Sequence, residues 1–180
     1  MGWRLSPTGS VESRLQLGLG ISLVLLIAVA WWLGHQALHQ SAEAYVLSRL
    51  QHDAEALLGA LELAPEGGVR LGRRGIAPVY EQPFSGHYHL VLLDGTEALR
   101  SRSLWDAHLA ARRLAPGETA QWRATGPEGQ ALLVWGSGFE RQGRALTLIL
   151  AEDLALLQRP LQSFERLFAL VALLGLGTML

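Results

Sequence analysis

The stretch YHLVLLDGTEALRSRS, residues 88–103, joins two strand-like segments through a dipeptide that favours a tight turn. Residues 88–93 are mostly large and apolar, as expected of a strand that faces a core. Asp94 and Gly95 tolerate the positive φ angles that two-residue hairpin turns require. The sequence therefore predicts a β-hairpin made of residues 88–93 and 97–103.

Further strand-like segments follow the hairpin and are separated by turn-forming residues. They are residues 119–125, 130–137 and 145–151. Gly126-Pro127 separates the first two, and the polar residues 140–143 separate the last two. Five short strands at these intervals predict one antiparallel sheet. Between the hairpin and these strands, residues 104–114 have a composition that favours a helix, which the following Pro-Gly would stop.

Ahead of the sheet, apolar residues recur at helical spacing from residue 41 to residue 63. The apolar stripe consists of Leu47, Leu50, Ala54, Leu57 and Leu61. We expect a helix over 41–63, continuous with the apolar run before it. Its stripe packs either on the domain's own sheet or on the same helix of a second copy, since barely two heptads are visible. Residues 64–86, rich in Gly and Pro, predict a loop with short strands at most.

The apolar run LGLGISLVLLIAVAWWL, residues 17–33, is long enough for a membrane span. It covers about 25 Å as a helix, and its flanks extend it toward the roughly 30 Å of a hydrocarbon core. We therefore predict a transmembrane helix over residues 15–36. The alternative is a cleaved signal peptide, because Ala28-Val29-Ala30 has the small-x-small form of a cleavage site.

A second apolar run, LFALVALLGLGTML, occupies residues 167–180. As a helix it covers only about 21 Å, so we expect the start of a truncated second span. A helix is expected to lead into it from near Glu152-Asp153, with a kink at Pro160. Arginines precede both spans, so charge favours neither orientation strongly. We expect residues 1–14 in the cytoplasm and residues 37–166 outside.

Composition excludes several functional classes. The chain has 15 basic residues, all arginine, against 16 acidic ones, so it offers no basic field for nucleic acid. It has no cysteine, which excludes disulfides and Cys-ligated metal sites. It contains no phosphate-binding loop, no G-x-S-x-G elbow and no H-E-x-x-H motif. We therefore predict no catalytic residue and no cofactor in this chain.

Two sets of residues are candidates for ligand binding. His87 and His89 lie two apart on a predicted strand, so their rings share a face and suit a metal or pH-sensing site, with His108 as a third ligand. Arg100 and Arg102 share a strand face in the same way and suit a carboxylate or phosphate. Each pair has a plain alternative, a solvated face of the strand. Two further arginine pairs lie nearby, Arg73-Arg74 and Arg112-Arg113.

The order of these segments resembles a known family. The most telling stretches are YEQPFSGHYHLVLLDG (80–95), RSRSLWD (100–106) and LILAEDLALLQRPLQSFERL (148–167). With the flanking apolar runs, they resemble the amino-terminal part of bacterial transmembrane sensor histidine kinases of two-component systems, in the PhoQ-like group.

The resemblance implies an α+β fold: a PAS-like (PDC) domain whose five-strand antiparallel sheet packs on a long N-terminal helix, flanked by two transmembrane helices. It also implies a homodimer in the bacterial inner membrane, with residues 37–166 periplasmic and an unknown small ligand or ion as stimulus. A kinase region after residue 180 would use ATP and magnesium and act on a cognate response regulator. The acidic patch for divalent cations found in PhoQ has no counterpart here, so magnesium sensing is not carried over.

Other functions fit the same layout. One is the sensor region of a receptor with a different output, a diguanylate cyclase or a chemoreceptor. Another is a membrane-anchored binding protein without an output domain. The residues after Leu180 distinguish these classes.

Overall fold

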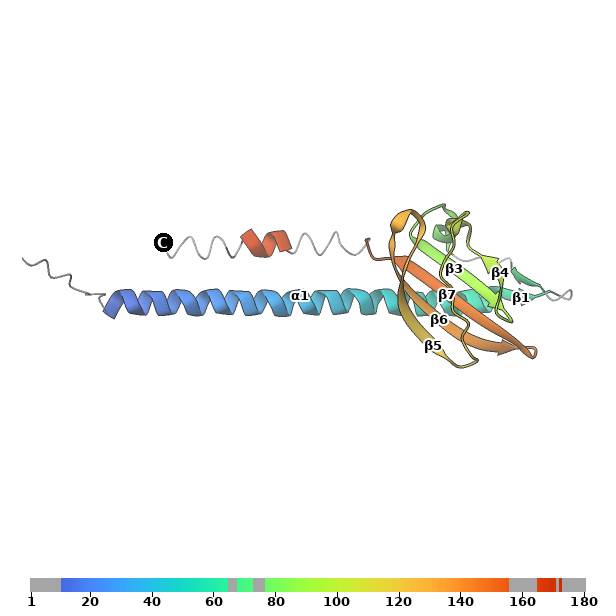
Figure 1. The fold of residues 1–180 in the computed structure, drawn as a ribbon, viewed down its shortest axis with the longest axis horizontal. Coiled ribbons are helices and arrows are strands. Elements are labelled where there is room, and N and C mark those ends of the chain that lie inside the picture. Colours follow the sequence, from blue (N-terminus) through green and yellow to red (C-terminus); the bar gives the residue numbers. More distant parts are fainter. Residues whose placement is uncertain (1–10, 65–67, 73–76, 156–164, 171, 173–180) are drawn as a thin grey trace, which may run out of the picture. The chain divides into compact units, whose positions relative to one another are not determined.

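A computed structural model of the chain describes residues 11–64, 68–72, 77–155, 165–170 and 172 (Figure 1). The chain divides into two compact units. One consists of Met1–Ser41 with Pro160–Leu180, and the other is Ala42–Arg159.

Helix α1 runs from Val11 to Ala60 without interruption. The predicted helix over 41–63 is therefore confirmed up to Ala60, and so is its continuity with the apolar run. Its predicted last turn is wrong, because strand β1 (Leu61–Leu63) pairs instead with strand β2 (Val69–Leu71). The Gly72 amide donates to the Ala60 carbonyl at 2.7 Å, which satisfies an acceptor at the helix end.

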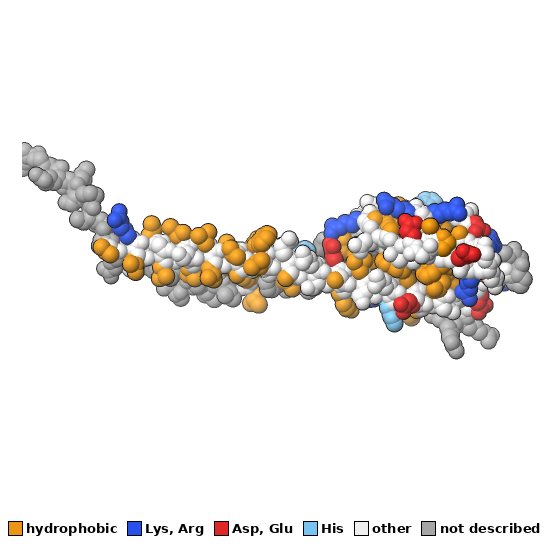
Figure 2. Space-filling view, turned by 90° about the horizontal axis from the view of Figure 1, so that it is seen from below, with side chains coloured by type: hydrophobic (Ala, Val, Ile, Leu, Met, Phe, Trp, Pro, Cys, Tyr) orange, Lys and Arg blue, Asp and Glu red, His pale blue; other side chains and the backbone are white. Residues whose placement is uncertain are grey.

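The amino-terminal part of α1 is apolar and exposed in its own unit. Figure 2 shows hydrophobic side chains along it, and Leu15, Leu26 and Trp32 are each more than half exposed. Within the described residues, α1 is the one helix long and apolar enough to cross a membrane. A signal sequence has the same properties, so both alternatives from the sequence stay open.

The second unit contains a five-stranded antiparallel sheet in the order β4-β3-β7-β6-β5 (Figure 1). Its strands are β3 (His87–Leu93), β4 (Thr96–Arg100), β5 (Thr119–Thr125), β6 (Ala131–Arg141) and β7 (Arg144–Asp153). An α+β fold with five antiparallel strands and a long N-terminal helix is therefore confirmed. The last strand in the sequence, β7, lies in the middle of the sheet.

Tight turns join the hairpins. Asp94 and Gly95, between β3 and β4, have φ angles of 52° and 85°, so the predicted hairpin turn is confirmed. Gln142 and Gly143 form a similar turn between β6 and β7, so the polar stretch 140–143 is half strand, residues 140–141, and half turn. The Asp94 carboxylate also accepts hydrogen bonds from Arg144 Nε at 2.8 Å and the Ala145 amide at 3.1 Å, which lowers the pKa of Asp94.

Helix α1 covers one face of the sheet. Its buried residues include Val46, Leu50, Ala54 and Leu57. They pack against residues of β3, β6 and β7 that include Val91, Leu133 and Leu148. The stripe thus packs on the domain's own sheet, which is the first of the two alternatives from the sequence.

The other face of the sheet is covered by the segment between β4 and β5. After a short 3-10 helix, η2 (Arg102–Leu104), this segment has no regular secondary structure up to β5, so the predicted helix over 104–114 is wrong. Its buried leucines, Leu104, Leu109 and Leu114, are five residues apart. An α-helix would turn residues at that spacing to different faces, whereas an irregular strap directs all three onto the sheet.

Gly138 allows this segment to approach β6 closely. A Cβ atom at this position would lie 2.1 Å from the carbonyl oxygen of Ala115. We expect Gly138→Ala to destabilise the domain by about 2 kcal/mol, because neither backbone has room to move. Denaturant unfolding of the full chain in detergent measures this loss. Gly59→Ala is the control: it meets no atom within 4 Å on exposed helix, so it should be neutral or slightly stabilising.

The end of β7 differs from the sequence prediction. Glu152 and Asp153 belong to the strand and are buried, so they are not helical themselves, and the next helical residue is Ala155, two positions beyond them. Asp153 Oδ1 does accept the Ala155 amide at 2.8 Å. The expected kink at Pro160 lies outside the described residues, as does most of the second apolar run, of which residues 167–170 and 172 are described as helical.

Candidate functional site

Helix α1 carries two charged side chains beside its apolar stripe. Arg49 and Asp53 are four residues apart, so they lie one above the other on the helix surface. Both reach polar partners on other elements of the same unit. Together these residues form a set that we call the Arg49 cluster: Arg49, Asp53, Tyr80, His87 and Glu152.

The centre of the Arg49 cluster is an ion pair between α1 and β7. The Glu152 side chain is only 3% exposed, and the Arg49 guanidinium holds both of its oxygens. One of these hydrogen bonds, from Arg49 Nε to Glu152 Oε2, is 3.1 Å long. A buried carboxylate needs such a partner, because its desolvation costs several kcal/mol. The pair therefore ties the helix to the end of the central strand.

His87, at the start of β3, extends this pair. Its Nε2 lies 2.5 Å from Arg49 Nη2 and 3.8 Å from Glu152 Oε1. A guanidinium has only donors, so His87 Nε2 must accept. The ring proton is then on Nδ1, which lies 3.3 Å from the Ser85 carbonyl oxygen.

Tyr80 closes the other end of the cluster. It lies on the 3-10 helix η1 (Pro78–Glu81), is 1% exposed, and donates its hydroxyl to Asp53 Oδ2 at 2.8 Å. Burial, followed by this hydrogen bond, raises the pKa of Tyr80, so it stays a donor at neutral pH. Its ring makes edge contacts with His87 and His89 at centroid distances of 6.2 and 5.2 Å.

His89 is a buried titratable residue of β3. It is 2% exposed, and within the described residues neither ring nitrogen has a hydrogen-bond partner. Burial lowers the pKa of His89 to about 4, so the ring is neutral at pH 7. His89 is therefore a core residue on a strand face that also carries the Arg49 cluster.

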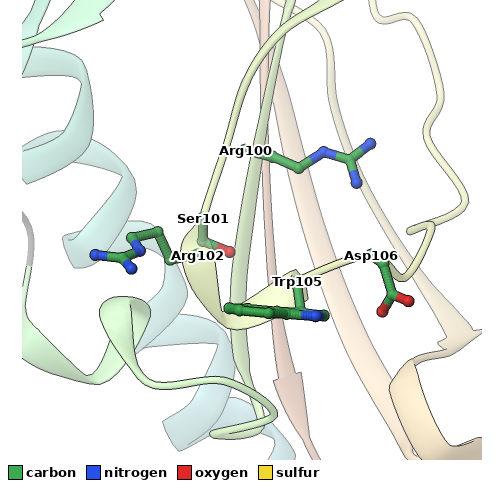
Figure 3. Close-up of a pocket in the computed structure, with 5 residues that line it drawn as sticks. All are labelled: Arg100, Ser101, Arg102, Trp105 and Asp106. Carbon is green, nitrogen blue, oxygen red and sulfur yellow. The ribbon is translucent and has the colours of Figure 1, made fainter.

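A second polar site lies at the end of β4. A cavity of about 330 Å³ is lined by Arg100, Ser101, Arg102, Trp105 and Asp106 (Figure 3). We call it the Trp105 pocket. In Figure 3 the Arg100 and Asp106 side chains extend to one side of the indole, whereas Arg102 points to the opposite side.

Both arginines of the Trp105 pocket have acidic partners. Glu97 binds Arg100 through two hydrogen bonds, of 2.5 and 2.8 Å, and raises its pKa. A third donor of Arg100 reaches the Ala107 carbonyl oxygen at 3.2 Å. Arg102 lies 3.8 Å from the Glu81 carboxylate, and both of these side chains are exposed.

The structure brings together only part of each predicted site. His87 and His89 share a face of β3, as the strand period predicts, and Tyr80 contacts both. His108 is exposed in the segment that covers the other face, and the described residues contain no group of three that could hold a metal. A metal-binding or pH-sensing role for His87 and His89 stays a prediction.

The structure describes two of the three predicted arginine pairs. Arg100 and Arg102 line one pocket, although Arg102 lies on η2 and not on a strand. Arg112 stacks over the Trp122 ring at 5.4 Å. Arg73 and Arg74 lie outside the described residues. An anion-binding role for Arg100 and Arg102 stays a prediction.

Sequence reasoning missed the Arg49 cluster, because its members come from four distant segments. One signal was present. Glu152 and Asp153 interrupt the apolar run of β7, and a carboxylate that ends a central strand needs a partner. Arg49 and Asp53, four apart beside the stripe, are the matching signal on the helix.

Comparison with known proteins defines the class: the chain is similar to sensor protein kinases. One relative is the Sensor protein kinase CarS of Pseudomonas aeruginosa, to which the chain is 32% identical over 168 residues. The match covers 93% of this chain and 35% of that protein, so the chain spans about a third of the length of its relative. The resemblance to the sensor region of a sensor kinase is thereby confirmed. No family model and no solved structure matches the chain.

Proposed function

We propose that this chain is the extracytoplasmic signal-sensing and transmembrane signalling region of a two-component sensor histidine kinase. The observation that carries this proposal is the 32% identity to Sensor protein kinase CarS over 93% of the chain. In the parent protein, a kinase region would use ATP and magnesium and pass the phosphoryl group to a response regulator. The α+β unit would be a PAS-like sensor acting in a homodimer.

The apolar part of α1 supports a membrane location. In this proposal residues 15–36 span the inner membrane, residues 1–14 are cytoplasmic, and residues 37–166 lie in the periplasm. Residues 167–180 would begin the second span. The continuity of α1 from Val11 to Ala60 then links the first span directly to the sensor domain.

The Arg49 cluster offers a route for the signal. It joins α1, which continues from the first span, to the end of β7, which precedes the second. A stimulus shifts such a system only if it binds two arrangements of it with different affinity. A ligand that strains or relaxes the Arg49–Glu152 pair would have that property.

Membrane topology tests the first part of the proposal. Alkaline phosphatase, which is active only outside the cytoplasm, is fused after Ala155 and, as a control, after Arg14. We expect activity only from the Ala155 fusion, and an intact mass that shows no cleavage after Ala30. An inactive Ala155 fusion, or cleavage at Ala30, would contradict the proposed arrangement.

Kinase output tests the second part. This chain replaces the matching segment of Sensor protein kinase CarS, and autophosphorylation is measured in membrane vesicles. We expect the chimera to be active and Arg49→Met to change its rate severalfold. Arg123→Met is the matched control, because Arg123 also pairs with an α1 carboxylate, Glu43, but at an exposed position. An inactive chimera, or equal effects of both substitutions, would argue against the proposal.

A further inference from the structure

Trp105 has a backbone conformation that large residues rarely adopt. Its φ and ψ angles are 51° and −117°, in a region that favours glycine. The Leu104 carbonyl accepts the Ala107 amide at 2.8 Å, so Trp105 lies inside a closed turn. Holding a tryptophan there costs free energy, and such strain is concentrated at ligand-binding and active sites.

Core packing does not explain the tryptophan. Trp105 is 59% exposed, whereas Trp122 and Trp135 are partly buried against the two apolar cores. The backbone conformation favours glycine at this position, and a large side chain gains little from burial where it is this exposed. We take an exposed indole that lines a pocket and is kept in this strained conformation as a sign of contact with another molecule.

The charges around the pocket decide what kind of molecule fits. Arg100 is neutralised by Glu97 and Arg102 lies beside Glu81. Asp106 has no hydrogen-bond or ion-pair partner among the residues that the structure describes. Arg102 points to the opposite side of the indole, so on the side where Arg100 and Asp106 lie the unpaired charge is the Asp106 carboxylate.

We propose that the Trp105 pocket binds a small organic ammonium ion, held by the Trp105 indole and the Asp106 carboxylate. The face of a tryptophan ring is the strongest aromatic partner for an ammonium group. Arg100 uses three of its five N–H donors on Glu97 and Ala107, so about two remain for an oxygen atom of the ligand. The cavity of about 330 Å³ has room for an ion of this size.

This proposal replaces the anion expected from Arg100 and Arg102 as the favoured ligand. An anion would have to compete with Glu97 for a guanidinium that already has a bidentate partner. The proposal that the ammonium ion binds is argued from the pocket alone. That the ion acts as the stimulus rests on the proposed sensory function.

Titration calorimetry of the full chain in detergent tests the pocket. The probes are choline, putrescine, benzoate, and 3,3-dimethylbutan-1-ol, which has the shape of choline without its charge. We expect at least one of the two cations, choline and putrescine, to bind, and its affinity to exceed that of the neutral alcohol and of benzoate at least about tenfold. No binding of either cation up to about 10 mM would overturn the proposal, as would equal binding of the alcohol or tighter binding of benzoate.

Variants separate the site from the fold. Asp106→Asn should weaken binding of the ammonium ion about tenfold, because it removes only the charge of the side chain. Trp105→Gly should abolish binding and yet raise the midpoint of thermal unfolding by about 4 °C, because glycine relieves the strain. Glu128→Gln, an exposed carboxylate outside the pocket, is the control and should leave binding unchanged. Unchanged binding in Trp105→Gly or Asp106→Asn would overturn the proposal.

The binding experiment does not depend on kinase activity. Binding of an ammonium ion to the full chain with no change in phosphorylation of the chimera would retain the pocket and contradict the role of that ion as the stimulus. Phosphorylation that responds to other stimuli, with no amine bound, would retain the proposed function and overturn the pocket.

Discussion

Arg49→Met is expected to destabilise the sensor domain by about 3 kcal/mol, because it leaves the Glu152 carboxylate buried without a cation. This value is the lower end for a broken buried pair, since the Arg49 side chain is 36% exposed and water reaches it. The loss is measured by denaturant unfolding of the full chain in detergent. Arg123→Met is the control and should cost less than about 1 kcal/mol, because its pair with Glu43 is exposed.

The double variant Arg49→Met with Glu152→Leu isolates the cause of this loss. Removing both charges leaves no buried carboxylate, so we expect most of the stability to return. A single variant that loses less than about 1 kcal/mol would show that Glu152 does not need this partner. A double variant as unstable as the single one would assign the loss to packing of the Arg49 stem.

Acid is expected to destabilise the domain through His89. Its pKa is about 4 in the folded protein and 6.5 without burial, so below pH 6.5 the unfolded chain binds a proton that the folded domain excludes. His89 therefore causes no pH-dependent loss of stability above pH 6.5, and the free energy of unfolding falls progressively as the pH decreases from 6.5 toward 4. The total loss over this interval is about 3 kcal/mol.

His89→Leu should remove this part of the pH dependence. Between pH 6.5 and 4, we expect the free energy of unfolding to fall by about 3 kcal/mol less in the variant than in the wild type. Other groups also titrate there, so the difference between the two proteins is the quantity to measure. His108→Leu, at an exposed position, serves as the control. Parallel pH profiles of His89→Leu and wild type would refute the assignment.

The sheet was predictable because its signals are local. Asp94-Gly95 determines one hairpin turn by the φ angles that it tolerates, and β5 has the bounds expected from its composition. The end of α1 was not predictable in this way. Helical spacing continues through Leu61, but pairing of β1 with β2 competes with the last turn, and that pairing depends on residues six to ten positions away.

The error at residues 104–114 has a similar cause. Local composition favours a helix there, yet the sheet face offers more burial to an irregular segment that directs Leu104, Leu109 and Leu114 inward. The candidate sites show the same limit. The strand period placed His87 and His89 on one face, but it did not indicate that Arg49 and Tyr80 would meet them there.

The central position of β7 determines when the sensor domain can form during synthesis. Strand β7 pairs with both β3 and β6. No other strand pairing joins the β3–β4 hairpin to the β5–β6 hairpin. Until residues 144–153 have left the ribosome, these hairpins stay separate, and the apolar stripe of α1 has no complete sheet to cover. A nascent chain stopped before β7 should therefore be sensitive to protease and bind chaperones, and one extended past Asp153 should become resistant in a single step.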